Sequence, residues 1–226
     1  KVVNQRERID QNTMIKKYDD IDKTDRQLKK FYHSQVFSDN EVNAIRAYTA
    51  DMFGPVNRYL YQGFEEGTTG TDAAKIKKTI ADLDSAFEQT EIPFDYSTYT
   101  GLSDRYKPEN FKVGETYVFR GYVSTSLSHD IALSEYSGDQ PDKRNKGKGG
   151  AVRVMLQVDL KKGQKGIYVS GNGKDNKREE KETLLPRGSH IKVISGPHHI
   201  DLNAVSRDAE PGQTQIVLFH CEMIDE

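Results

Sequence analysis

The sequence predicts an α+β fold, because helical patterns fill the chain up to about residue 90 and strand patterns follow from about residue 95. In the first part, apolar residues recur at every third or fourth position, as they do along one face of a helix. In the second part, apolar residues alternate with others, as they do in half-buried strands. We therefore expect a single domain over residues 1–226, with a mainly helical part at 1–90 and a strand-rich core at 91–226.

The composition excludes several classes of protein. The chain has 226 residues, of which 35% are hydrophobic and 30% charged, and its net charge is −2. With so little net charge, the molecule as a whole is not attracted to nucleic acid or to a membrane surface. No run of residues is long and apolar enough for a transmembrane helix. We expect neither a membrane nor a nucleic acid as a partner.

Cysteine and histidine usage argues against a metal site and a disulfide framework. Cys221 is the single cysteine, so no intrachain disulfide or cysteine-cluster metal site can form. The six histidines lack the helical spacing of zinc ligands, and we expect no metal. The chain starts at Lys1 without a basic-then-apolar leader, so a signal peptide is either absent or removed by truncation. The lone cysteine favours a reducing cytoplasm, although a cysteine-poor secreted toxin would look the same.

Three helices are predicted in the first part. Ser38–Glu41 has the spacing of a capping box, and the helix that it begins should end at Gly54-Pro55. Another helix follows, and Thr71 or Asp72 should cap the third. Residues 1–36 are dense in charge and should form helical segments or an arm. The apolar stripes of the three helices consist of Val42, Ile45 and Met52, of Val56, Tyr59 and Leu60, and of Ile76, Ile80, Leu83 and Phe87.

Strand patterns mark six segments of the second part, separated by polar spacers. One spacer, Pro141–Gly150, carries four Lys and Arg residues among glycines. A solvated insertion is the favoured interpretation, because no aromatic residue is interleaved for base stacking on a nucleic acid. The strands are expected at 117–126, 152–160, 166–169, 182–185, 191–194 and 216–223.

Ser124-Thr125-Ser126 lies on a predicted strand and could carry chemistry. Alternation places Ser124 and Ser126 on one side of the strand and Thr125 on the other. One side can then pack, while the other offers two hydroxyls to a cleft. A polar strand end would look the same, so the tripeptide alone is weak evidence.

Glu180-Lys181-Glu182 leads directly into an apolar strand. On a strand, Glu180 and Glu182 point to one face, because they are two residues apart. Taken alone, the segment is best explained as a solvated run of charges. The direct passage into Leu184 and Leu185 instead favours the edge of a cleft.

Together these residues resemble the arginine-directed mono-ADP-ribosyltransferases of the Arg–Ser–Glu class, and most closely the Alt and Mod enzymes of T-even bacteriophages. The resemblance covers most of the chain after about residue 38. Three stretches carry it, in the right order: Ala81–Phe87, Phe119–Leu127 and Glu180–Gly188. Three ordered matches are far more specific than any one of them.

The resemblance implies a fold and a reaction. The fold is a helical lobe packed on two small antiparallel β-sheets, with NAD in the cleft between them. The reaction transfers ADP-ribose from NAD to a protein arginine and releases nicotinamide. Its transition state is similar to an oxocarbenium ion, so a fixed carboxylate beside the ribose would stabilise the developing positive charge.

The resemblance also implies roles for individual residues. Glu182 matches the glutamate that bonds the ribose and stabilises the cation. Glu180 matches the one that positions the incoming guanidinium and helps to deprotonate it, which the high pKa of arginine requires. Ser124 matches the serine that holds the catalytic glutamate, and Thr125 and Ser126 would shape the nicotinamide pocket.

Target recognition is implied for the segment that precedes the two acids. Gly166–Glu179 would be a mobile target-recognition loop. Within it, Tyr168 is the aromatic residue expected to stack on the target arginine, next to Glu180.

One departure from the family pattern affects the NAD site. The family's first motif, an aromatic residue followed by arginine, is matched by Tyr99-Thr100-Gly101, with Thr100 where arginine is expected. An arginine grips the NAD phosphates with a planar fork that a hydroxyl cannot replace. Three explanations are open: Arg105 or Arg120 supplies the charge, the substitution inactivates the chain, or the register of this match is wrong. We favour an NAD site, functioning now or formerly, in which the backbone of Gly101 meets the nicotinamide amide.

The first functional hypothesis is an enzyme that modifies arginine on host proteins, such as RNA polymerase or translation proteins. It would act in the host cytoplasm after being packaged in a virion and injected. The alternative, motivated by Thr100, is a degenerate ADP-ribosyltransferase that serves as a binding or virion-structural module. A third interpretation is a secreted toxin of the same chemistry directed at actin or a G protein.

Overall fold

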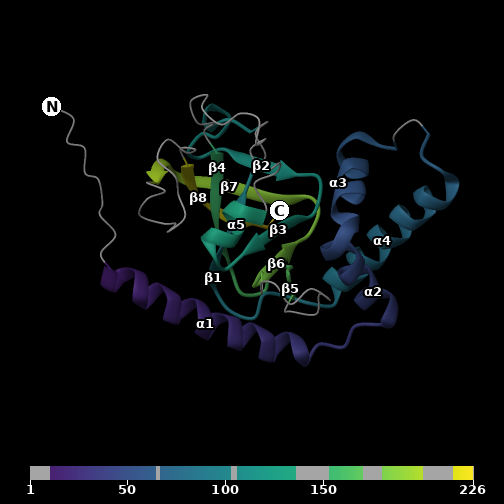
Figure 1. Cartoon of the computed structure of the whole chain (residues 1–226), viewed down its shortest axis with the longest axis horizontal. Helices are drawn as coiled ribbons and strands as arrows, with labels where there is room; N and C mark the ends of the chain where they lie inside the picture. Colours follow the sequence, from purple (N-terminus) through teal and green to yellow (C-terminus); the bar gives the residue numbers. More distant parts are fainter. Residues whose placement is uncertain are drawn as a thin grey trace.

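The computed structural model of the chain describes residues 11–64, 67–102, 106–135, 153–169, 180–200 and 216–225 (Figure 1). Four helices precede the strands: α1 (Gln11–His33), α2 (Asp39–Ala47), α3 (Phe53–Gln62) and α4 (Gly70–Glu88). A π-helical turn, η1 (Tyr48–Met52), joins α2 to α3. The predicted basic loop Pro141–Gly150 lies outside the described residues.

The start of α2 confirms the predicted capping box. The Oγ of Ser38 accepts a hydrogen bond from the backbone N–H of Glu41 (3.4 Å), and the carboxylate of Glu41 accepts one from the N–H of Ser38 (2.7 Å). The expected end at Gly54-Pro55 was wrong. The helical path continues through η1 into α3, where Pro55 occupies the first turn and needs no backbone donor. The cap of α4 is Thr69, and not the expected Thr71 or Asp72.

Eight strands follow among the described residues, and five of the six predicted segments coincide with one strand each. The predicted strand at 117–126 is divided in two, because the backbone turns at Arg120–Tyr122. A short helix, α5 (His129–Glu135), follows the second of these strands. The strands are β1 (Tyr96–Gly101), β2 (Thr116–Phe119), β3 (Val123–Ser126), β4 (Arg153–Leu160), β5 (Ile167–Val169), β6 (Glu182–Leu185), β7 (Ser189–Ile200) and β8 (Ile216–Ile224).

The strands form one sheet, in the order β2-β7-β8-β4-β1-β3-β6-β5. All described pairs are antiparallel except β4 with β8. The α+β class is therefore confirmed, but the prediction of two separate sheets was wrong. The sheet curls on itself, since Val123 of β3 and Leu185 of β6 share a core with residues of β4, β7 and β8 such as Leu156, Val193 and Phe219. Hydrogen bonds between β1 and both of its neighbours join the two halves.

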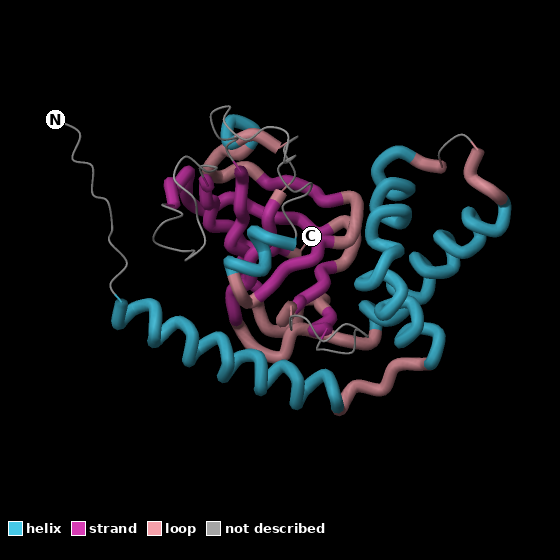
Figure 2. Tube along the Cα trace, in the orientation of Figure 1, coloured by secondary structure: helices cyan, strands magenta, loops and turns pink. Residues whose placement is uncertain are grey.

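The helices cover the β5–β6 end of the sheet (Figure 2). α2, α3 and α4 gather on one side of it, and α1 runs along its lower edge in this view. Their core includes Leu184 of β6 and Ile167 of β5. Tyr32 of α1 donates a hydrogen bond to the carbonyl oxygen of Gly166 (2.6 Å). In the described part of the chain, no helix is both long and apolar enough to cross a membrane.

Candidate active site

Glu182 is a buried carboxyl group at the start of β6. Only 4% of the residue is exposed, and it pairs with Ser126 of β3 on one side and Val169 of β5 on the other. Burial and, to a lesser degree, the charge of Glu180 raise the pKa of Glu182 to about 7, against a hydrogen bond from Ser124 that lowers it. A carboxyl group that is costly to ionise, and yet held by a hydroxyl, is a typical feature of a functional site.

Ser124 holds Glu182 as predicted. In the antiparallel pair β3–β6, Ser126 lies opposite Glu182, and Ser124 is two residues from Ser126. All three side chains therefore lie on one face of the sheet. On this face, Leu184 packs into the core that is formed with the helices, and Tyr99, at the other end, packs against α5.

Tyr48 and Asn57 complete the cluster, and the sequence predictions missed both. Tyr48 is 1% exposed, and its hydroxyl donates to the carbonyl oxygen of Tyr122 (3.3 Å) and accepts from Nδ2 of Asn57 (2.9 Å). Burial raises the pKa of Tyr48. The charge of Glu182 also raises this pKa, whereas a hydrogen bond with Ser124 lowers it. Tyr48 follows Ile45 at helical spacing, so the sequence pattern marks it as a core residue and gives no sign of its hydrogen bonds at the site.

Gly121 lets the β2–β3 turn approach α3 closely. A Cβ atom at this position would lie 2.5 Å from Oδ1 of Asn57 and 3.0 Å from the ring of Tyr61. The same Oδ1 accepts a hydrogen bond from the backbone N–H of Tyr122 (3.0 Å), and Nδ2 of Asn57 donates to its carbonyl oxygen (3.1 Å). Asn57 thus binds the helical part to the strand that carries Ser124.

Glu180 lies close to Glu182, but not for the predicted reason. β6 begins only at Glu182, and Lys181 has a φ of 47°, so the alternation of a strand does not extend to Glu180. The carbonyl oxygen of Glu180 accepts a hydrogen bond from the Oγ of Ser126 (2.6 Å). Its charge contributes to the raised pKa of Glu182, which places the two acids within electrostatic reach of each other.

Thr125 and Ser126 tie the strands together. Thr125 is fully buried, and its hydroxyl donates to the carbonyl oxygen of Thr183 (2.6 Å) and accepts from Thr98 (2.8 Å). Ser126 is equally buried, and its Oγ also accepts from the N–H of Ser128 (3.0 Å). Both hydroxyls are therefore occupied within the protein, and their part in shaping a nicotinamide pocket stays a prediction.

The strand β1 carries the residues that match the family's first motif. Tyr99 pairs with Ser126 and packs beside His129 of α5. Thr100 is 3% exposed and points to the opposite face, where it donates weakly to the carbonyl oxygen of the next residue, Gly101 (3.4 Å). Its buried hydroxyl group provides no positive charge in place of the arginine of the family's motif.

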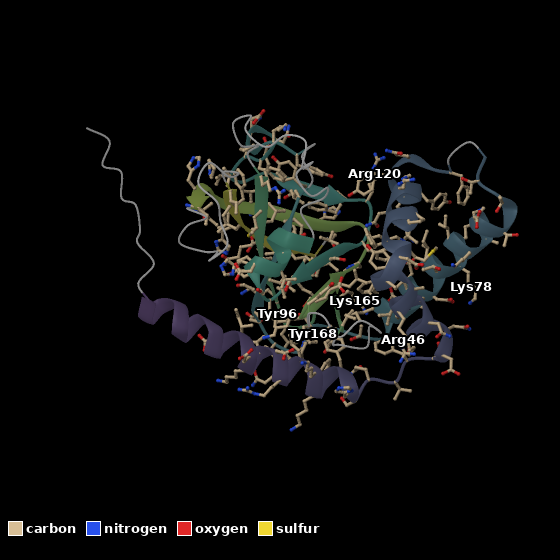
Figure 3. The ribbon with its side chains drawn as sticks, in the orientation of Figure 1. Arg46, Lys78, Tyr96, Arg120, Lys165 and Tyr168 are labelled. Carbon is tan, nitrogen blue, oxygen red and sulfur yellow. The ribbon has the colours of Figure 1, made fainter. Side chains whose placement is uncertain are left out.

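The sequence offers two arginines, Arg105 and Arg120, that could supply the missing charge. Arg120 is exposed at the end of β2, and Figure 3 shows it beside α3. Arg105 lies outside the described residues.

A surface hollow of about 390 Å³ lined by Tyr106, Phe111 and Tyr117 lies at the β2 edge, whereas Glu182 is near the other end of the sheet.

The predicted role of Tyr168 was wrong. Its ring lies in β5 within the helical core and is 4% exposed (Figure 3). Its hydroxyl donates to the carboxylate of Asp25 in α1 (2.5 Å). A ring enclosed in this way offers no face to a target arginine. The remainder of the predicted recognition loop, 170–179, lies outside the described residues.

The sequence model of the family described as ADP-ribosyltransferase exoenzyme matches residues 16–222. The chain belongs to this family. A curated relative, the NAD(+)–arginine ADP-ribosyltransferase EFV of Enterococcus faecalis, is 28% identical over 153 residues. The match covers 68% of this chain and 28% of the relative, so the chain spans little more than a quarter of that protein.

Solved structures of similar fold agree with this assignment. Plx2a, an ADP-ribosyltransferase toxin from Paenibacillus larvae, has a TM-score of 0.64 at 19% identity, over 91% of this chain and 97% of its own. The Vis toxin from Vibrio splendidus has a TM-score of 0.60 at 18% identity, over 92% and 86%. The C3 exoenzyme of Clostridium limosum has a TM-score of 0.60 at 19% identity, over 91% and 95%.

Enzymes of this family use NAD as the donor of ADP-ribose. Among the described residues, no cluster of His, Cys, Asp and Glu could hold a metal ion. The particular resemblance to the phage enzymes stays a prediction.

Proposed function

We propose that the chain transfers ADP-ribose from NAD to an arginine side chain and releases nicotinamide. The observation that carries the proposal is the buried carboxyl of Glu182, held by Ser124 and close to a second acid, Glu180. One relative bears arginine as the acceptor in its name, which supports the choice of acceptor.

The chemistry divides between the two acids. The bond between the ribose carbon and the nicotinamide nitrogen breaks, and its electron pair leaves with nicotinamide. The ionised carboxylate of Glu182 stabilises the positive charge that develops on the ribose. A nitrogen of the guanidinium then bonds to the ribose carbon, and Glu180 accepts the proton that this nitrogen gives up.

Labelled NAD and agmatine, a small guanidine, test the proposal directly. The wild type should release nicotinamide and transfer label to agmatine. Glu182→Gln should lose both activities by at least about a hundredfold, the scale of a charge-stabilising group in an active site. Glu180→Gln should lose transfer but retain hydrolysis of NAD. If Glu182→Gln matches the wild type in both assays, the proposal is overturned.

We further propose that the acceptors are host proteins of transcription or translation, reached in the host cytoplasm after injection with a virion. The three ordered stretches that resemble the phage enzymes support this choice. Mass spectrometry of host extract treated with the wild type, with Glu182→Gln as control, would identify the modified arginines. Modification confined to actin or G proteins would favour a toxin instead.

Thr100 supports a second candidate, a degenerate member of the family that binds a partner without catalysis. Its buried, neutral side chain stands where the family pattern has a phosphate-binding arginine. Calorimetric titration with NAD separates the two candidates: micromolar binding favours the enzyme, and no binding favours the module.

A further inference from the structure

Lys181, between the two acids, has an unusual backbone conformation. Its φ of 47° is the only positive value at a non-glycine residue in the described part of the chain. The left-handed region is sterically unfavourable for a residue with a Cβ atom and a long side chain. Contacts around the segment must therefore hold it in this state.

Three contacts hold the segment, and they come from two parts of the molecule. Two are made by the end of β3 and the residue after it: Ser126 donates to the carbonyl oxygen of Glu180 (2.6 Å), and the N–H of Leu127 donates to that of Lys181 (3.1 Å). The third comes from α1, where the carboxylate of Asp22 accepts a hydrogen bond from Nζ of Lys181 (2.5 Å). The side chain of Lys181 is only 19% exposed, so it is confined on its way to Asp22.

The two acids depend differently on these contacts. Glu182 is held in the sheet, between β3 and β5, and by Ser124. Glu180 lies before β6 begins, and the direction of its side chain follows the backbone of Lys181. A change at Lys181 would therefore move Glu180 and leave Glu182 in place.

We propose that Asp22 is a positioning residue for the acceptor step: by holding Lys181 in the left-handed conformation, it fixes Glu180 relative to Glu182. This inference rests on the proposed function, in which Glu180 serves the guanidinium and Glu182 serves NAD. It makes α1, which precedes the rest of the described fold, a determinant of how efficiently arginine competes with water.

The contact is also sensitive to salt. The side chain of Asp22 is 59% exposed, and ions screen a pair of this kind. Raising the ionic strength should lower the ratio of transfer to hydrolysis in the wild type towards the ratio of an Asp22 variant. A residue that merely supports the fold would not produce this convergence.

The test compares transfer to agmatine with hydrolysis of NAD in Asp22→Asn. Transfer should fall by about fivefold to tenfold, the scale of a displaced catalytic group, and hydrolysis should stay within twofold. Asp22→Glu, which can still reach Lys181, should retain transfer. Two matched controls should keep the wild-type ratio: Asp82→Asn breaks an exposed ion pair on α4, and Asp25→Asn weakens the hydrogen bond from Tyr168 of β5 and removes the ion pair with Lys29 within α1.

Amide hydrogen exchange at Leu127 tests the tether without any activity. This N–H is hydrogen-bonded to the carbonyl oxygen of Lys181. Its exchange rate should therefore rise severalfold in Asp22→Asn and stay the same in Asp82→Asn. Unchanged exchange, equal losses of transfer and hydrolysis, or the same selective loss in Asp25→Asn would each overturn the inference. A wild type without any NAD chemistry would overturn the proposed function and the acceptor role of Asp22, while the exchange would still show whether the tether exists.

Discussion

Arg187, in the turn after β6, donates hydrogen bonds to both carboxylate oxygens of Asp84 in α4, from Nε (3.0 Å to each) and Nη2 (2.7 Å to Oδ2). The hydroxyl of Tyr122 donates to the same carboxylate (2.7 Å). Two stretches singled out in the sequence, Ala81–Phe87 and Glu180–Gly188, thus meet in one contact. It binds the helices to the strand that leads to Ser124.

Breaking this contact should destabilise the protein. Arg187→Met should lower the free energy of unfolding by about 1 kcal/mol, since both side chains are partly exposed, and the midpoint of thermal unfolding by a few degrees. A double-mutant cycle with Asp84→Asn should give a coupling of about 1 kcal/mol. The exposed Lys78–Asp82 pair serves as the comparison and should couple by about 0.3–0.5 kcal/mol. Equal couplings in the two pairs would contradict the prediction.

Glu182 should make the stability of the protein depend on pH. An ordinary glutamate has a pKa of 4.5, and burial raises that of Glu182 to about 7. Between these values, the folded state holds a proton that the unfolded state has lost, so the free energy of unfolding falls as pH rises. Glu182→Gln should remove this fall and be more stable than the wild type at pH 8, by on the order of 3 kcal/mol.

Urea unfolding at pH 5 and pH 8 checks this prediction. Glu88→Gln is a suitable control, because it replaces a carboxyl group whose side chain is 82% exposed. A Glu182→Gln variant that is less stable than the wild type at pH 8 would show that the carboxylate is well solvated in the folded state.

The activity should rise with pH, because the ionised form of Glu182 is the one that stabilises the cation. In the free enzyme, kcat/KM for NAD hydrolysis should have its half-maximal value near pH 7. Ser124→Ala removes a hydrogen bond that favours the carboxylate, so the midpoint should move upward, by about one pH unit. Ser97→Ala, which removes a hydroxyl bonded to Asp159, should leave the midpoint in place. A downward shift in Ser124→Ala would contradict the assignment.

Arg120 should contribute to the binding of NAD. Arg120→Ala should weaken binding by roughly tenfold to a hundredfold, the loss of one charge-assisted hydrogen bond, and should reduce the dependence of binding on salt. Lys78→Ala, which removes an exposed cation from α4, should bind NAD as the wild type does. Titration calorimetry at two salt concentrations measures both effects. Unchanged binding would assign the phosphates to another cation, such as Arg105.

Short sequence patterns predicted the helix cap and the strands whose formation depends mainly on neighbouring residues. The capping box at Ser38 and the strand at 182–185 were both located from a few adjacent residues. The family resemblance identified Glu182 and Ser124, and the structure brings these two together as expected. In each case the decisive information lies within a short stretch of sequence.

Features that depend on distant contacts could not be predicted. Tyr48 and Asn57 join the site through hydrogen bonds to Tyr122, more than 60 residues later in the chain, which no local spacing reveals. The left-handed backbone of Lys181 depends on α1, about 160 residues earlier in the chain. The strand pattern at 166–169 included Tyr168, but the family resemblance implied a role for it in a recognition loop, and nothing in its neighbourhood indicated that Asp25 would accept a hydrogen bond from its hydroxyl in the core.

The buried thiol of Cys221 can report how often the β-sheet around it opens. This thiol is completely enclosed in β8, and burial raises its pKa to about 12. The thiolate is the form that attacks an alkylating reagent, so the reagent modifies this position only in molecules whose central strands have separated. Because the chain has no other cysteine, the labelling rate measures how often the curled sheet opens, with no engineered probe.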